Sequence, residues 1–95
     1  MSTMSTDAAE TLALNVLGWL VANDDLLPVF LGSTGAGREE LRERAGDPDF
    51  LAGVLDFLMM DDAWVMAFCD QTDIPYEYPM KARAALPGGA QTHWT

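Results

Sequence analysis

The side chains that could act as a nucleophile or a general base are one cysteine and one histidine. Either role requires a second polar group that activates or orients the first. Cys69 ends an apolar run that begins at Trp64, and it precedes Asp70, whose charge raises a thiol pKa rather than lowering it. His93 lies in the segment Gly88 to Thr95, where no neighbour would orient an imidazole. We therefore expect a buried, unreactive thiol and a histidine without a catalytic role.

Paired carboxylates are the groups that could bind a divalent cation or share a proton. The pairs Asp24-Asp25 and Asp61-Asp62 each precede an apolar run with helical spacing, where a carboxylate can cap the helix and its neighbour can interact with the helix dipole. The alternating oxygen ligands of a calcium loop are missing, and no glycine-rich loop ends in the Lys-Ser/Thr that cradles phosphate. The carboxylates are therefore predicted to be caps, and we expect no metal and no cofactor.

The charge of the chain is strongly negative, with fifteen acidic residues against five basic ones and a net charge of −10. Such a charge repels phosphate backbones and anionic lipid headgroups, so neither nucleic acid nor a membrane surface is an expected partner. Glu39, Glu40 and Glu43 lie among the arginines, and Glu40 precedes Arg44 by four residues, the spacing of a helix ion pair. We expect a solvated helix there whose charges pair with one another. The five bases are Arg38, Arg42, Arg44, Lys81 and Arg83.

The elements that would position these groups are helices, because the apolar spacing follows the helical period throughout and no strand pattern competes with it. Capping side chains are expected at Thr6-Asp7, Asn23-Asp24, Asp47 and Asp61-Asp62. We predict an all-α single domain over residues 1–95, with flexible or extended termini at 1–6 and 88–95. The predicted helices cover residues 7–22, 24–34, 38–45, 48–60, 62–72 and 76–86, and Pro79 leaves the start of the last one open.

An internal repeat emerges when the sequence is shifted by 38 residues without a gap. Val16 then falls on Val54, and Phe30 falls on Phe68. Further identities follow the same shift, so the sequence predicts a six-helix array built from two three-helix units. The alternative is chance, because two amphipathic helices of similar length align somewhere. The other matched pairs are Leu17 with Leu55, Trp19 with Phe57, Leu20 with Leu58, Asp24 with Asp62, Thr34 with Thr72 and Glu39 with Glu77.

The first and fourth predicted helices are apolar around most of their circumference and should form the central pair. Part of that apolar surface exceeds what a small domain buries, so Trp19, Met60 and Trp64 are the candidate interaction surface. Gly18 and Gly53 lie inside these helices, where each costs about 1 kcal/mol, which indicates the close approach of another backbone.

Several motifs along the chain are specific enough to carry a family resemblance. They are Val16 to Leu20, Phe30 to Gly35, Asp47 to Leu51, Val54 to Leu58, Asp61 to Val65, Ala84 to Gly89 and the terminal His93-Trp94-Thr95. In these motifs the chain resembles a family of small all-helical domains of unknown function that is found chiefly in alphaproteobacteria. The resemblance implies a single helical domain with no assigned activity and no catalytic residues. Pro79 departs from the family pattern and leaves the register of the last helix open.

The function favoured by these features is a non-enzymatic protein–protein interaction module, whose partner is another protein or a second copy of the chain. The competing hypothesis is a carrier of a small apolar ligand, with a pocket between the first, second, fourth and fifth helices. An enzyme acting through carboxylates is a third and rarer possibility. The start of the chain has no basic residue before its first apolar stretch, so no export signal is visible and we expect a cytoplasmic protein.

Overall fold

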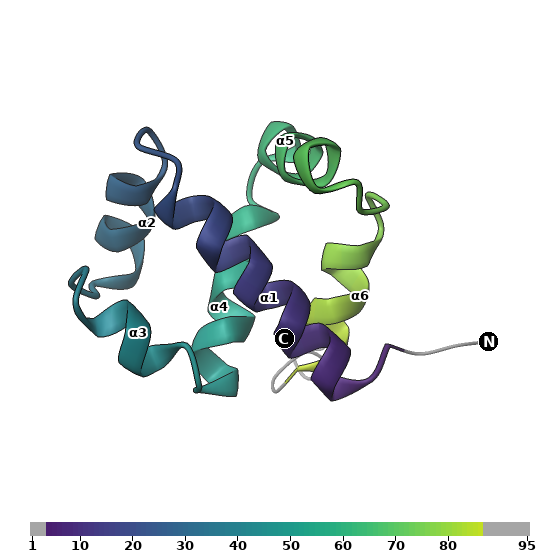
Figure 1. Ribbon diagram of the computed structural model, residues 1–95, viewed down its shortest axis with the longest axis horizontal. Coiled ribbons are helices and arrows are strands. Elements are labelled where there is room, and N and C mark those ends of the chain that lie inside the picture. The colour runs from purple at the N-terminus through teal and green to yellow at the C-terminus, as the bar shows by residue number, and fades with distance from the viewer. Residues whose placement is uncertain (1–3, 87–95) are drawn as a thin grey trace, which may run out of the picture.

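A computed structural model describes residues 4–86 and confirms the all-helical fold (Figure 1). Within these residues the chain forms helices joined by short turns, without a strand. The helices are α1 (Thr6–Val21), α2 (Leu27–Thr34), α3 (Glu40–Arg44), α4 (Pro48–Leu58), α5 (Asp62–Thr72) and α6 (Tyr78–Ala85). Of the predicted terminal segments 1–6 and 88–95, residues 1–3 and all of 88–95, including His93, lie outside the described residues, whereas Ser5 and Thr6 form the start of α1.

The helix starts show which capping predictions were right. Asp47 and Asp61 accept hydrogen bonds from the backbone N–H groups two residues later, at 3.0 and 2.8 Å, as predicted. The cap of α1 is different, because Ser5 Oγ accepts from the Ala8 N–H and the predicted Thr6-Asp7 pair lies inside the helix. Before α2, the Asn23 side chain accepts hydrogen bonds from the N–H groups of Asp25 and Leu26. These bonds close a turn, and α2 begins after it, at Leu27.

Prolines and residues with a left-handed backbone conformation define the remaining helix boundaries. Pro28 and Pro79 both lie in the first turn of a helix, where a missing N–H removes no helical hydrogen bond. Pro79 therefore fixes the start of α6 at Tyr78, two residues later than the predicted boundary. Gly35 ends α2 with φ of 74° and Asp73 ends α5 with φ of 60°, the left-handed conformation typical of a helix C-cap.

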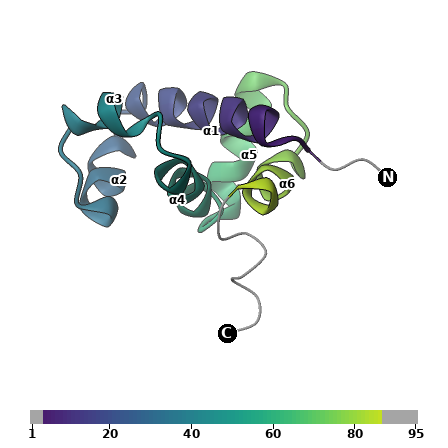
Figure 2. The same ribbon diagram turned by 90° about the horizontal axis from the view of Figure 1, so that it is seen from below.

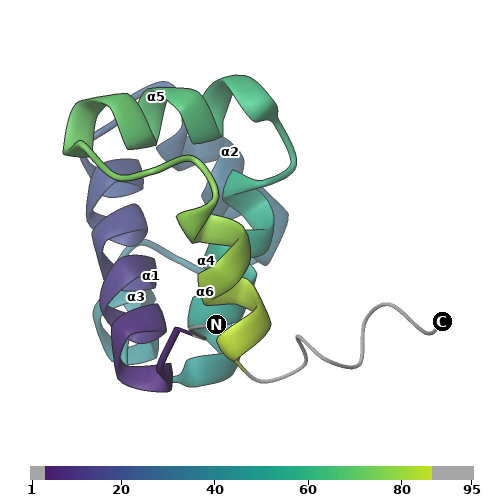
Figure 3. The same ribbon diagram turned by 90° about the vertical axis from the view of Figure 1, so that its right-hand side faces the viewer.

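The centre of the molecule is the pair α1 and α4, with α6 packed against both (Figure 3). α2 and α3 lie on one side of this pair, and α5 and α6 lie on the other (Figure 1). One face of α1 is buried through Leu12, Val16 and Leu20. Arg83 of α6 donates to Asp56 of α4 at 2.7 Å and links these two helices at the surface.

Aromatic side chains join the outer helices to the central pair. Phe30 of α2 packs edge-on against Phe50 and Phe57 of α4, with ring centroids 6.0 and 5.2 Å apart. Phe68 of α5 packs edge-on against Trp19 of α1 at 5.8 Å. Edge-to-face pairs add to the stability gained from burial alone.

The prediction that a backbone approaches Gly18 and Gly53 closely was wrong. A Cβ atom at either position would meet no atom of the described residues within 4 Å, apart from the helix's own backbone and its chain neighbours. The two glycines are therefore not needed for packing within the described chain.

None of the helices within residues 4–86 has the length and apolar content needed to cross a lipid bilayer.

Candidate functional site

The three predicted surface residues differ in how far they reach solvent. Met60 follows α4 and is 70% exposed, whereas Trp19 and Trp64 are half-buried. The Trp19 indole N–H donates to Gln71 Oε1 at 2.9 Å, and the Trp64 ring stacks on Phe57 at 4.9 Å between centroids. Both tryptophans thus have partners within the chain, and Met60 is the most accessible of the three.

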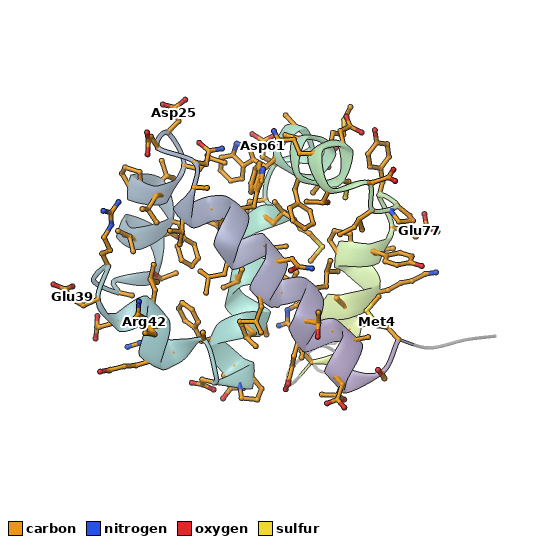
Figure 4. All side chains as sticks on the ribbon, viewed as in Figure 1. Met4, Asp25, Glu39, Arg42, Asp61 and Glu77 are labelled. Atoms are coloured by element: carbon orange, nitrogen blue, oxygen red, sulfur yellow. The ribbon has the colours of Figure 1, made fainter. Side chains whose placement is uncertain are left out.

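Large exposed side chains are also found on α5, on α6 and in the segment that joins them. A shallow hollow of about 270 Å³ between these elements is lined by Met59 and Val65 together with Pro79 and Met80 of α6. Its acidic lining residues include Glu77, which lies beside α6 at the opposite end of the molecule from α3 (Figure 4). We call this the methionine surface; its exposed large residues are Met60, Met66, Tyr76, Tyr78 and Met80.

A more apolar groove lies between α1 and α3, where sequence analysis placed no site. Its volume is about 450 Å³ and it is open to solvent along its length. α1 contributes an apolar floor, in which Leu14 and Val21 are 44% and 43% exposed. We call this the α1–α3 groove; it is lined by Leu14, Leu17, Gly18, Val21, Ala22, Arg38, Leu41, Arg42 and Ala45.

Arg38 and Arg42 border the α1–α3 groove, and the prediction that the charges of this segment pair with one another was wrong. No ion pair involves either arginine within residues 4–86. Glu40 instead accepts from the Gly37 N–H at 2.6 Å, which closes the turn before α3. Arg44 lies over the Phe50 ring at 5.8 Å rather than pairing with Glu40. The groove therefore has two cations at its border and an apolar floor.

The spacing of apolar residues on α1 is the feature of the sequence that corresponds to this groove. Leu14, Leu17, Gly18 and Val21 follow the spacing i, i+3, i+4, i+7, which places them along one stripe of α1. The buried residues Leu12, Val16 and Leu20 form the neighbouring stripe. With two apolar stripes on one helix, the sequence does not say which of them the rest of the fold covers.

The cysteine lies beside a third hollow, of about 320 Å³, which is lined by the end of α5 and the segment that follows it. Cys69 is buried, and its thiol donates to the Pro75 carbonyl at a sulfur–oxygen distance of 3.7 Å. Burial raises the pKa of the Cys69 thiol, and the nearby charge of Asp70 raises it further. Asp70 also accepts a hydrogen bond from the Tyr76 hydroxyl at 2.6 Å, which raises the tyrosine pKa. This arrangement favours the protonated, weakly nucleophilic thiol.

The carboxylate pairs are not brought together. Asp61 lies at the start of α5 and caps it, as predicted, whereas Asp25 lies at the tip of the turn before α2 (Figure 4). The prediction that Asp24-Asp25 caps a helix was wrong, because α2 begins at Leu27 without a side-chain cap. Within residues 4–86, three or more His, Cys, Asp or Glu side chains do not gather at any point where they could hold a metal ion.

The pocket predicted between the first, second, fourth and fifth helices has no counterpart among the three hollows described above. Aromatic pairs occupy the contacts between these helices, with Phe30 of α2 against α4 and Trp19 of α1 against Phe68 of α5. The α1–α3 groove is lined by α1 and α3 instead. Figure 2 shows α1 from the side.

Comparison with known proteins gives one family. A family model described as "Protein of unknown function (DUF3572)" matches residues 6–89, which is most of the chain. No curated protein matches, and no solved structure matches.

Proposed function

The chain belongs to the DUF3572 family of proteins of unknown function, and from its structure we propose that it is a non-enzymatic protein–protein interaction module. The observation that carries this proposal is the α1–α3 groove, in which the central helix leaves Leu14 and Val21 uncovered. Contiguous exposed apolar surface bordered by polar groups is typical of binding sites in small proteins. A segment of another protein would cover this surface.

The shape of the groove favours a protein segment over a small ligand. A small-molecule site encloses most of the surface of its ligand, roughly 70–90%. The α1–α3 groove is open to solvent along its length, so a ligand lying in it would remain wet on one side. A protein segment can present an apolar face to the groove and a polar face to water. The ligand-carrier alternative has no comparable support from an enclosed pocket.

The proposed partner is a different protein or a second copy of this chain, and sedimentation equilibrium separates the two. The methionine surface and the groove lie on different elements, so either could contribute to self-association. A dimer at micromolar concentration that Met60→Gln dissociates would assign the methionine surface to self-association. A monomer would direct the search to other proteins.

The test of the groove uses two glycine substitutions in the same central helix pair. Gly18→Gln places a long polar side chain over the apolar floor of the groove, and Gly53→Gln adds the same side chain in α4, away from the groove. Both should fold, because neither Cβ meets a neighbour within 4 Å and glutamine is the better helix former. Circular dichroism and thermal melting check this first.

The readout is capture of binding proteins from native cells with wild type and both variants, followed by amide NMR shift mapping with the captured protein. We expect Gly18→Gln to lose the partner and Gly53→Gln to keep it, with shifts concentrated in α1 and α3. Equal capture by all three proteins would exclude the groove as the docking site.

A further inference from the structure

We propose that the segment bound by the α1–α3 groove is an amphipathic helix whose acidic side chains pair with Arg38 and Arg42. This inference rests on the proposed function and names the chemical class of the partner. The groove combines an apolar floor with two arginines that have no ion pair among the described residues. A partner must therefore supply both apolar contacts and negative charge.

Arg38 and Arg42 have no ion pair among the described residues, which is unusual for so acidic a chain. Three glutamates lie within a few residues of them, yet Glu40 is engaged by the Gly37 N–H. Glu39 lies at the outer edge of the molecule, while Arg42 lies on α3 (Figure 4). Arginine presents a planar fork of donors that matches a carboxylate with two parallel hydrogen bonds. An incoming Asp or Glu can therefore form bonds that the chain's own acids do not form.

The dimensions of the floor match a helix. Leu14 and Val21 are seven residues apart on α1, which corresponds to about 10 Å, or roughly two helical turns. Between them lies Gly18, above which the described chain leaves open space, so an apolar side chain of the partner can reach the backbone of α1. A partner helix with apolar residues at i, i+3, i+4 and i+7 would cover this length. Arg38 and Arg42 would then meet acids that flank the apolar stripe.

The net charge of −10 does not prevent an acidic helix from binding in the groove, because only charges close to the partner interact strongly with it. Screening in physiological salt reduces interactions beyond about 8 Å, so acids elsewhere on the molecule act weakly on the partner. Arg38 and Arg42 are in the lining of the groove itself. Glu39 and Glu43 are the nearby acids on the same segment that a partner must avoid, which favours acids placed on one side of the partner helix.

The test is a displayed library of short helical peptides, with the residues of one face randomised, selected on the full chain. Counter-selection on Gly18→Gln removes peptides that bind elsewhere, and Gly53→Gln serves as the matched positive control. We expect the recovered helices to carry an apolar stripe flanked by Asp or Glu. Recovery of stripes flanked by Lys or Arg, or without charge preference, would overturn this inference while leaving the groove as a docking site. Failure to recover any helix specific for the open groove would overturn this inference, and the capture comparison of wild type with Gly18→Gln would then decide the proposed function by itself.

A recovered acidic helix then tests the two arginines directly. Arg38→Gln and Arg42→Gln should each weaken its binding roughly two- to fivefold, which is the range of exposed ion pairs. Lys81→Gln removes the same charge on α6, at the other side of the central pair, and should leave the affinity unchanged. Raising the salt concentration should weaken binding to wild type more than to the double arginine variant. Equal affinity for wild type and the double variant would contradict the proposed pairing.

Discussion

At the scale of single residues, side chains at three helix starts accept hydrogen bonds from backbone N–H groups two or three residues later. Asp47 and Asp61 cap their helices, and Cys69 is buried with a raised pKa, as their neighbours in sequence indicated. Gly18 was wrongly expected to allow the approach of a backbone, and Arg44 was wrongly expected to pair with Glu40. At Gly18 no distant segment comes close, whereas Glu40 and Arg44 each contact a residue nearby in the sequence, Gly37 and Phe50.

Replacing the helix glycines by alanine should stabilise the protein. Gly18→Ala and Gly53→Ala should each raise the free energy of unfolding by about 0.5–1 kcal/mol, because alanine loses less backbone entropy in a helix. Apart from the helix's own backbone and the chain neighbours, the added methyl group meets no atom of residues 4–86 within 4 Å at either position. Urea denaturation followed by circular dichroism measures the change. A loss of stability at Gly18 would mean that another chain segment packs there in solution.

The stability of the protein should fall on the alkaline side. Burial raises the pKa of the Cys69 thiol above its ordinary value of 9.0, and the hydrogen bond to Asp70 raises that of the Tyr76 hydroxyl. The unfolded chain therefore loses these protons first, the folded chain holds more protons, and the free energy of unfolding decreases as pH rises past about 9. Urea denaturation at a series of pH values measures the slope. Cys69→Ala and Tyr76→Phe should each flatten it, and an unchanged slope in both variants would contradict this origin.

At the scale of elements, the predicted helix order holds and the boundaries move by a few residues where a turn intervenes. Several structural features recur at the 38-residue shift and support the proposed repeat. The Thr34 and Thr72 hydroxyls each donate to the carbonyl of a buried phenylalanine four residues earlier, at 3.0 and 2.7 Å. The left-handed C-caps Gly35 and Asp73 are also 38 residues apart. We propose that α1–α3 and α4–α6 are two copies of one three-helix unit.

An experimental structure should allow residues 12–45 to superpose on residues 50–83 with matched helices in register. α1 and α2 should match α4 and α5 more closely than α3 matches α6, because α3 spans Glu40–Arg44 and α6 spans Tyr78–Ala85. The measurement is the direction of each helix axis after superposition of the first pair. Opposite packing directions for the second pair would leave chance as the explanation of the sequence match.

Asn23 and Asp61, also 38 residues apart, both accept backbone hydrogen bonds ahead of a helix and should contribute similarly to stability. Asn23→Ala and Asp61→Ala should each lower the free energy of unfolding by about 1 kcal/mol, because the first leaves turn N–H groups before α2, and the second a helix N–H of α5, without a side-chain acceptor. Thermal melting of both variants measures the change.

A chelator tests whether Asp61 binds a metal ion. Since Asp61 is assigned to a cap, we expect the chelator to leave the melting temperature unchanged. A chelator-induced decrease that Asp61→Ala abolishes would show a metal site instead.

At the scale of the whole molecule, the charge of −10 opposes the compact state, because within residues 4–86 only Lys81 and Arg83 form ion pairs with acids. Moderate salt screens this repulsion, so the melting temperature should rise as sodium chloride is added. Choline chloride at the same ionic strength is the control. An equal rise with both salts indicates screening, whereas a rise with sodium alone would indicate a bound cation.

The all-helical fold, the order of the helices, two of the four predicted caps and the environment of Cys69 follow from the sequence alone. These properties depend on residues within about four positions of one another, which the sequence displays directly. The packing of the helices settles which apolar stripe of α1 stays uncovered and which charges remain unpaired. Both stripes look alike in sequence, and the choice between them depends on where α3, α4 and α6 pack. The α1–α3 groove, with Arg38 and Arg42 at its border, exists because that packing covers one stripe and leaves the other partly open.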